Sequence, residues 1–140
     1  MNLKIQRTCL NIDWHQVSKI LREVNMASFE ENVHKTAFEN SHTVIFVYDD
    51  EKLIGFGRAI SDGVYQAAIY DVAVLPEYQG NKIGKKIVEH ILNSLPQCNF
   101  ILYASPGKEP FYEKLNFRKM KTGMALFRYP EIMQKKGFTE

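Results

Sequence analysis

The chain has 140 residues, of which 45% are hydrophobic and 24% are charged, and its formal net charge is +2. This length and composition predict one globular domain over residues 1–140, with a core at about 2–129 and a loose C-terminal tail at 130–140. The small net charge argues against nucleic acid as a partner, because nucleic-acid binding normally needs a strongly basic face.

The two cysteines, Cys9 and Cys98, form no CxxC pair and no Cys/His cluster with the spacing of a zinc site. Neither a disulfide framework nor a metal site is therefore predicted. No stretch reaches the roughly 20 apolar residues of a membrane helix, and the first residues lack the apolar core of a secretory signal. We therefore expect a cytoplasmic protein with no membrane partner.

The first third of the chain predicts one strand and two helices. Residues 2–8 alternate weakly between polar and apolar side chains, which is typical of an edge strand. A second short helix is expected over residues 29–39. Between these segments, Asn11 and Asp13 are possible helix caps. The apolar residues that follow recur at spacings of three and four, which predicts a helix: Trp14, Val17, Ile20, Leu21 and Val24.

The middle of the chain predicts three strands. Residues 42–48 and 53–60 are rich in β-branched and aromatic side chains and are joined by the polar turn at residues 49–52, so they indicate a hairpin. After a break at residues 61–63, residues 66–75 form a nearly continuous apolar run. Such a run is typical of a central strand that is covered on both faces.

Further along, the pattern predicts a helix, a buried strand, a short helix and a final strand over residues 82–94, 100–104, 109–115 and 124–129. The resulting order predicts an α/β (α+β) fold with a mixed central sheet and helices on both faces. A crossover between residues 66 and 104 should make one pair of strands parallel. The helical stripe that defines the crossover is formed by Ile83, Ile87, Val88, Ile91 and Leu92.

The turn between the central strand and the following helix has the features of an anion site. The first N–H groups of a helix have no internal partner and carry partial positive charge, and Gly80 and Gly84 would let the backbone approach a phosphate closely. Lys82, Lys85 and Lys86 could add charge there. The alternative is that the glycines serve close packing and the lysines form a solvated helix face. The spacing differs from GxxxxGK[ST] and GxGxxG, so those nucleotide-binding classes lose support.

Two segments of the chain resemble the GNAT superfamily of acyl-coenzyme A-dependent N-acyltransferases. Residues 79–84 (QGNKIG) match its Q/R-x-x-G-x-G/A motif at the first and last positions, with Lys82 in place of the middle glycine. Residues 111–117 (FYEKLNF) resemble the FYEKxGF segment of the family, and Asn116 tolerates the left-handed conformation of the glycine that it replaces. Residues 53–58 are also similar to a central strand of the family, so the likeness spans roughly residues 12–129.

The resemblance implies a GNAT-like fold in which the sheet is splayed open between the strand with Val72 and the strand with Phe100. Acetyl-coenzyme A is then the acyl donor, with its pyrophosphate in the loop and its pantetheine arm in the gap. No metal is expected. The residues expected to hold the coenzyme are Val72, Val74, Gln79, Gly80, Asn81, Lys82, Ile83, Gly84 and Lys85.

Acetyl transfer to an amine needs a proton acceptor, because an alkyl amine has a solution pKa of about 10. Asp71 is a candidate base, acting directly or through water, and its alternative is a structural carboxylate bound to backbone or to an arginine. Strand alternation places Asp71 on the opposite face from Tyr70 unless the strand is bulged. By resemblance, the Tyr112 hydroxyl donates a proton or a hydrogen bond to the departing thiolate. Its alternative is packing of a short helix.

The resemblance also implies direct transfer in a ternary complex to a primary amine, which we expect to be a small molecule. The alternatives are a protein or peptide acetyltransferase and a non-catalytic acyl-coenzyme A sensor. Three aromatic residues could line an amine pocket, and four acids could attract a cationic amine; the alternative is that the aromatic residues pack in the core and the acids are solvated. These residues are Phe29, Phe38 and Tyr65, and Glu30, Glu31, Glu39 and Asp62. A final strand with hydrophobic side chains could mediate a homodimer through Met124, Leu126 and Phe127.

Overall fold

The computed structural model describes all 140 residues, which form two compact units, Met1–Leu102 and Tyr103–Glu140. The expectation that residues 1–140 form a single domain stays a prediction. None of the helices is both long enough and apolar enough to span a bilayer.

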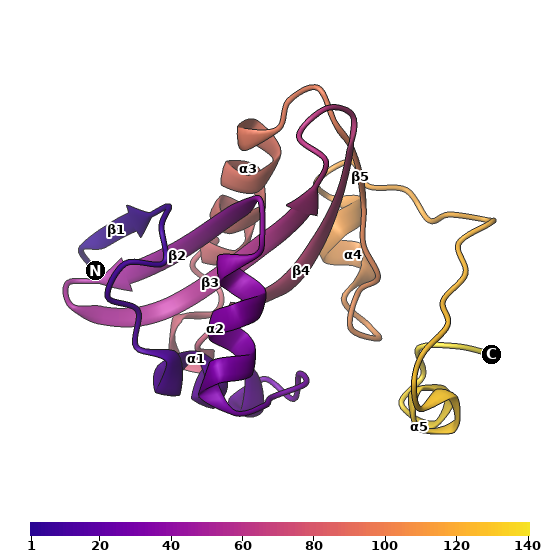
Figure 1. Cartoon of the computed structure of the whole chain (residues 1–140), viewed down its shortest axis with the longest axis horizontal. Helices are drawn as coiled ribbons and strands as arrows, with labels where there is room; N and C mark the ends of the chain where they lie inside the picture. The colour runs from indigo at the N-terminus through magenta and orange to yellow at the C-terminus, as the bar shows by residue number, and fades with distance from the viewer. The chain divides into compact units, whose positions relative to one another are not determined.

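The first unit is built on a five-stranded mixed sheet with the strand order β1-β2-β3-β4-β5 (Figure 1). All neighbouring strands are antiparallel except β4 and β5, which run parallel and are joined through a helix. This arrangement confirms the predicted edge strand, hairpin and crossover. The strand predicted to be central, β4, is the fourth of five and pairs with β5 over three residues only. The strands are β1 (Leu3–Gln6), β2 (Thr43–Asp49), β3 (Lys52–Ser61), β4 (Gln66–Val74) and β5 (Asn99–Ile101).

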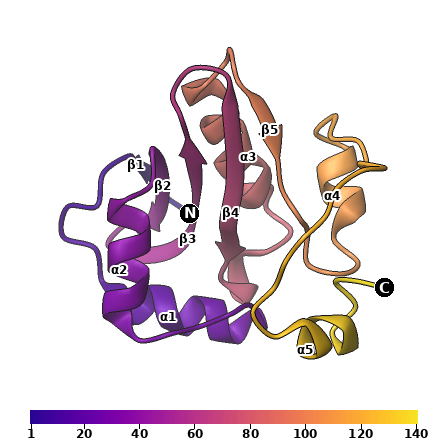
Figure 2. The same cartoon turned by 45° about the vertical axis from the view of Figure 1, so that its right-hand side comes forward.

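Helices cover both faces of this sheet, as predicted. Figure 2 shows α1 (Trp14–Glu23) and α2 (Glu31–Glu39) on one side and α3 (Ile83–Ser94) on the other. The helix α1 begins at a cap in which an oxygen of Asp13 accepts a hydrogen bond from the backbone N–H of Gln16 at 3.2 Å. The core on the α1 and α2 side contains a group of aromatic rings among aliphatic side chains, with Phe38 and Phe46 at a centroid distance of 5.4 Å.

On the opposite face, two glycines let α3 approach β3 closely. A Cβ atom added at Gly57 would stand 2.8 Å from a methyl carbon of Ile87 and 3.3 Å from one of Ile91. A Cβ atom at Gly55 would stand 3.3 Å from Ile87. The sheet face without side chains at these positions therefore receives the apolar stripe of α3, and this packing sets where α3 begins relative to β4.

The strand β5 is shorter than the predicted strand at residues 100–104, and it is less buried than expected. It pairs with β4 over three residues only, and Ile101 is exposed. The apolar run that suggested a longer strand continues into residues that have no ladder partner.

In the second unit the predicted final strand at residues 124–129 is absent. Met124 and Leu126 are 97% and 96% exposed, and no strand pairs with this segment. An alternating apolar pattern forms a strand only where a neighbouring strand supplies hydrogen bonds and a covered face, so the pattern alone misled the prediction. The unit contains α4 (Glu109–Glu113) and α5 (Pro130–Lys135).

The helix α5 also corrects the prediction of a loose tail at residues 130–140. It begins with Pro130 in its first turn, where the missing proline N–H costs nothing, and good helix formers follow. Its end packs through Phe138, which contacts the rings of Tyr103 and Phe127 at 5.9 and 6.4 Å.

Candidate active site

The strand β4 has an unpaired edge over most of its length. Its pairing with β5 covers Gln66, Ala67 and Ala68, and β5 does not extend alongside residues 69–74 of β4. This parting confirms the splayed sheet that the resemblance implied. The main chain of the second half of β4 is therefore not used in a ladder on that side.

A β-bulge interrupts β4 within this unpaired stretch. Phe56 of β3 lies opposite Ala73, and Arg58 lies opposite Tyr70, so β4 has one residue more than β3 between these two pairs. Asp71 occupies the bulge with a φ of 56°. This left-handed conformation costs a residue other than glycine about 1–2 kcal/mol. The bulge resolves the alternation problem, because Tyr70 and Asp71 both reach the same side chain of β3.

That side chain is Arg58, which the sequence analysis did not single out. Its Nε donates to Oδ2 of Asp71 at 2.8 Å, and its Nη1 donates to Oγ of Ser41 at 3.2 Å. The guanidinium also lies over the rings of Phe38 and Tyr70, at 5.6 and 5.3 Å from their centroids. A single charged residue inside the apolar segment 53–60 was the available signal.

The structure thus brings Asp71 together with an arginine, as the structural alternative for this carboxylate required. The ion pair is largely shielded, since the side chains of Arg58 and Asp71 are 14% and 23% exposed. The second carboxylate oxygen, Oδ1, accepts no hydrogen bond within the chain. A carboxylate that is held by one oxygen and open at the other can also serve as an oriented base.

The candidate anion loop follows directly from the end of β4. A short helical turn, η1 (Pro76–Tyr78), leads to Gln79, whose side-chain Nε2 donates to the carbonyl of Val74 at 3.0 Å. Gly80 then adopts a φ of 85°, and the space that a Cβ atom would occupy there is open. The side chain of Asn81 donates to the carbonyl of Tyr78 at 3.1 Å.

The helix α3 begins at Ile83 with its first N–H groups free of any side-chain cap. Lys82 occupies the capping position with a φ of 62° and a ψ of 20°, so it takes the left-handed conformation without being a glycine. The backbone path at the position of the missing family glycine is therefore available, at a cost of about 1–2 kcal/mol. Uncapped N–H groups at the start of a 12-residue helix, beside the exposed Lys82 and Lys85, make an electropositive end.

The loop is also attached to β2. The Tyr78 hydroxyl donates to Oδ2 of Asp49 at 2.7 Å. The backbone N–H of Asn2 and this tyrosine hydroxyl hold the pKa of the Asp49 carboxyl below its usual value. The same hydrogen bond raises the pKa of Tyr78. At neutral pH the phenol is therefore protonated and donates, and the carboxylate is ionised and accepts.

Val72 and Val74 lie on the unpaired part of β4. Their side chains point toward β3 on the α3 side, where methyl carbons lie 3.2 Å and 3.5 Å from the Cβ positions of Gly57 and Gly55. A contact of Val72 or Val74 with a ligand at the open edge would therefore use the main chain.

Tyr112 belongs to the second unit, in α4. Its ring makes edge contacts with Phe111 and Phe117, at centroid distances of 4.9 and 5.7 Å. Burial raises the pKa of its phenol, so the hydroxyl stays protonated and able to donate at neutral pH. Asn116 adopts a φ of 71° at the end of the helix, which confirms the conformation expected where the family has glycine. The placement of Tyr112 beside the thioester stays a prediction.

One further buried polar residue was missed. His34 in α2 is 3% exposed, and its Nε2 accepts a hydrogen bond from the backbone N–H of Phe29 at 2.9 Å. Burial lowers the pKa of His34, which favours the neutral ring that this hydrogen bond requires. The sequence carried no signal for it, because four histidines at scattered positions do not distinguish a buried one.

Comparison with known proteins agrees with this geometry. The family model described as "Acetyltransferase (GNAT) family" matches residues 7–117. An N-acetyltransferase described as uncharacterized, ycf52 from Pyropia yezoensis, is 31% identical over 135 residues, which cover 91% of this chain and 71% of the relative. A GNAT-family acetyltransferase from Streptococcus pneumoniae has the same fold, with a TM-score of 0.76 at 20% identity, covering 90% of this chain and 98% of that one.

A third relative, named histone acetyltransferase TAP1 from Glycine max, is 37% identical over 86 residues. The match covers 59% of this chain and 35% of that protein. The sheet that opens beside β4, the anion loop at the start of α3 and these matches lead to one conclusion. The chain belongs to the GNAT family of acetyltransferases.

Proposed function

We propose that this protein transfers the acetyl group of acetyl-coenzyme A to the primary amine of a small molecule, directly within a ternary complex. The observation that carries the proposal is the electropositive start of α3, placed immediately after a strand whose edge is unpaired. A pyrophosphate suits such a helix end because it is anionic and can accept several N–H hydrogen bonds.

Residues of this loop and of β4 fit the two halves of the donor. The backbone N–H groups of the loop and of the first turn of α3 would hold the pyrophosphate. The residues concerned are Gln79, Gly80, Asn81, Lys82, Ile83, Gly84 and Lys85. The main chain of Val72 and Val74 would hydrogen-bond to the amide groups of the pantetheine arm, much as a neighbouring strand would. Support comes from the end of the pairing between β4 and β5 at Ala68, so that β5 does not cover the main chain of Val72 and Val74.

In the proposed reaction the amine nitrogen forms a bond to the thioester carbon and the carbon–sulfur bond breaks. Asp71 accepts the proton that the amine loses, directly or through water, by its open oxygen Oδ1. The Tyr112 hydroxyl protonates the departing thiolate, which suits a phenol that stays neutral at physiological pH. Main-chain N–H groups near Val74 stabilise the oxyanion.

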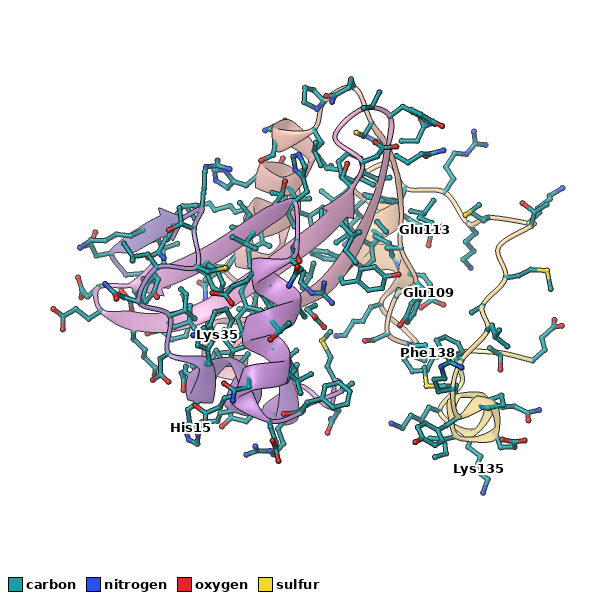
Figure 3. All side chains as sticks on the ribbon, viewed as in Figure 1. His15, Lys35, Glu109, Glu113, Lys135 and Phe138 are labelled. Atoms are coloured by element: carbon teal, nitrogen blue, oxygen red, sulfur yellow. The ribbon has the colours of Figure 1, made fainter.

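A groove of about 670 Å³ between α1 and the start of α2 is the proposed acceptor site. Its lining includes Phe29, which is 58% exposed, and three charged residues, Glu30, Glu31 and Arg22, so acids outnumber the single arginine. His15 lies 4.0 Å from Glu31, and Figure 3 shows its side chain pointing away from the sheet. An aromatic side chain beside two carboxylates favours a cationic amine with an apolar or aromatic body.

A protein or peptide amine is the second candidate. It is favoured by the name of the histone acetyltransferase relative, although this chain covers only 35% of that protein. The expected cytoplasmic location and the homodimer remain predictions.

The test is a thiol-release assay with acetyl-coenzyme A and a panel of arylalkylamines, polyamines and amino sugars, followed by mass spectrometry of the product. Acetylation of a panel member supports the proposal, whereas labelling of peptides alone would favour the second candidate. Calorimetry should show coenzyme A binding that Gly84→Glu weakens, because the variant adds bulk and negative charge beside the pyrophosphate. The matched control is Asn93→Glu, which adds the same charge near the other end of α3. Equal binding by both variants would contradict the site.

A further inference from the structure

Arg58 connects three elements of the first unit at the point where β4 is bulged. It lies on β3, its Nε holds Asp71 on β4, and its Nη1 holds Ser41 just beyond the end of α2. The Ser41 hydroxyl donates in turn to the carbonyl of Ala37 at 2.8 Å. A continuous chain of hydrogen bonds therefore runs from the backbone of α2 through the guanidinium to the carboxylate.

The guanidinium is fixed in orientation as well as in position. Phe38 and Tyr70 contribute rings at 5.6 and 5.3 Å from its central carbon, and the side chain is 14% exposed. A planar group that stacks on rings while donating from two nitrogens has little rotational freedom. Lysine offers a single ammonium and no plane, so it cannot reproduce this arrangement.

The carboxylate at the other end of the chain sits on strained backbone. Asp71 has a φ of 56°, which a residue other than glycine keeps only when its surroundings determine it. The Asp71 side chain has one hydrogen-bond partner, Arg58, which donates to Oδ2 and leaves Oδ1 open. A base that is oriented through one oxygen by a third group is a recurring arrangement for proton transfer.

We propose that Arg58 is a positioning residue for acetyl transfer: it holds the bulged Asp71 so that Oδ1 faces the incoming amine. The inference rests on the proposed function, because it takes Asp71 as the proton acceptor. It adds that the position of this carboxylate is coupled to the C-terminal end of α2 through Ser41.

The test is a double-mutant cycle with Arg58→Met, Asp71→Asn and the combined variant, measured as kcat and as KM for acetyl-coenzyme A and for the amine. Arg58→Met should lower kcat about 10- to 100-fold and leave KM for acetyl-coenzyme A within about twofold, because the loop is untouched. In the Asp71→Asn background, Arg58→Met should cause no further loss of kcat. Lys4→Met, which removes one positive charge from the exposed edge strand β1, should match the wild type.

Independent losses that multiply in the double variant would overturn the inference, since Arg58 would then not act through Asp71. A lower melting temperature with unchanged kcat would also overturn it and leave Arg58 a purely structural residue. If Arg58→Met does not fold, Arg58→Lys replaces it in the cycle, because it keeps the charge but loses the planar fork. It should then lower kcat relative to the wild type and cause no further loss in the Asp71→Asn background. An inactive wild type would refute the proposed function itself, and that result is distinct from an active wild type with multiplying losses.

Discussion

The close contact between α3 and β3 predicts that Gly57→Ala destabilises the protein. The new Cβ would stand 2.8 Å from a methyl carbon of Ile87, 3.2 Å from one of Val72 and 3.3 Å from one of Ile91. Carbon atoms pack best at about 3.5–4.0 Å, so α3 must move away from the sheet by a substantial fraction of an ångström. Overpacking of this kind costs about 1–3 kcal/mol.

An opposing effect must be subtracted from that cost. Alanine in place of glycine reduces the conformational freedom of the unfolded chain, which stabilises by about 0.5–1 kcal/mol. The net loss is then up to about 2.5 kcal/mol in the free energy of unfolding. For a chain of this size, about 3–4 °C of melting temperature corresponds to 1 kcal/mol, so Tm should fall by up to about 10 °C.

The assay is thermal and urea unfolding followed by circular dichroism, with Gly123→Ala as the matched control. At Gly123 the nearest side-chain atom to a new Cβ is 3.5 Å away, which is an ordinary contact, so only the stabilising effect remains. Gly57→Ala and Gly123→Ala should therefore shift Tm in opposite directions. A Gly57→Ala variant stabilised as much as Gly123→Ala would show that α3 does not pack on β3 as described. Because α3 carries the anion loop, the same variant should also bind coenzyme A more weakly.

Three other outcomes follow from the site. Lys82→Gly should raise the free energy of unfolding by up to about 1 kcal/mol in urea titrations, because glycine adopts the left-handed conformation without strain. A lower free energy of unfolding would contradict the φ of 62° at this position. Because burial lowers the pKa of His34, the unfolded chain binds more protons than the folded one, and stability should fall as pH decreases below about 6.5. The His34→Gln variant should flatten that part of the curve of Tm against pH. The effect should be larger than that of His90→Gln. Tyr112→Phe should lower kcat about 10- to 100-fold with KM for acetyl-coenzyme A unchanged, and full activity in stopped-time thiol assays would exclude the hydroxyl from the reaction.

Side-chain periodicity was sufficient for the elements that are covered by their neighbours. The stripe from Ile83 to Leu92 predicted α3, and the continuous apolar run at residues 66–75 predicted a strand with both faces covered. Both patterns are strong because burial selects apolar residues along one face of the helix and at nearly every position of the strand. At residues 124–129 the same kind of pattern predicted a strand that has no partner, since a ladder depends on what lies beside the segment.

The chemistry of the site was only partly visible for a similar reason. The anion loop could be recognised from local spacing, because its glycines and the helix start are contiguous in the chain. The bulge at Asp71 could not, since a bulge is a difference in residue count between two strands and depends on the register with β3. The link from Asp71 to Arg58 and Ser41 joins residues 13 and 17 positions apart and therefore leaves no local signature.

The strand β4 carries both the bulge at Asp71 and, through Gln79, the attachment of the anion loop at Val74. The length of this one strand therefore sets the distance between the point where a pyrophosphate would bind and the point where a carboxylate would meet the amine. Each residue of a strand advances about 3.3 Å, so a change of even two residues in this interval would preserve which side chains face the core yet displace the two points by about 7 Å. The helices around an acceptor could differ between relatives without altering this distance, because β4 alone sets it.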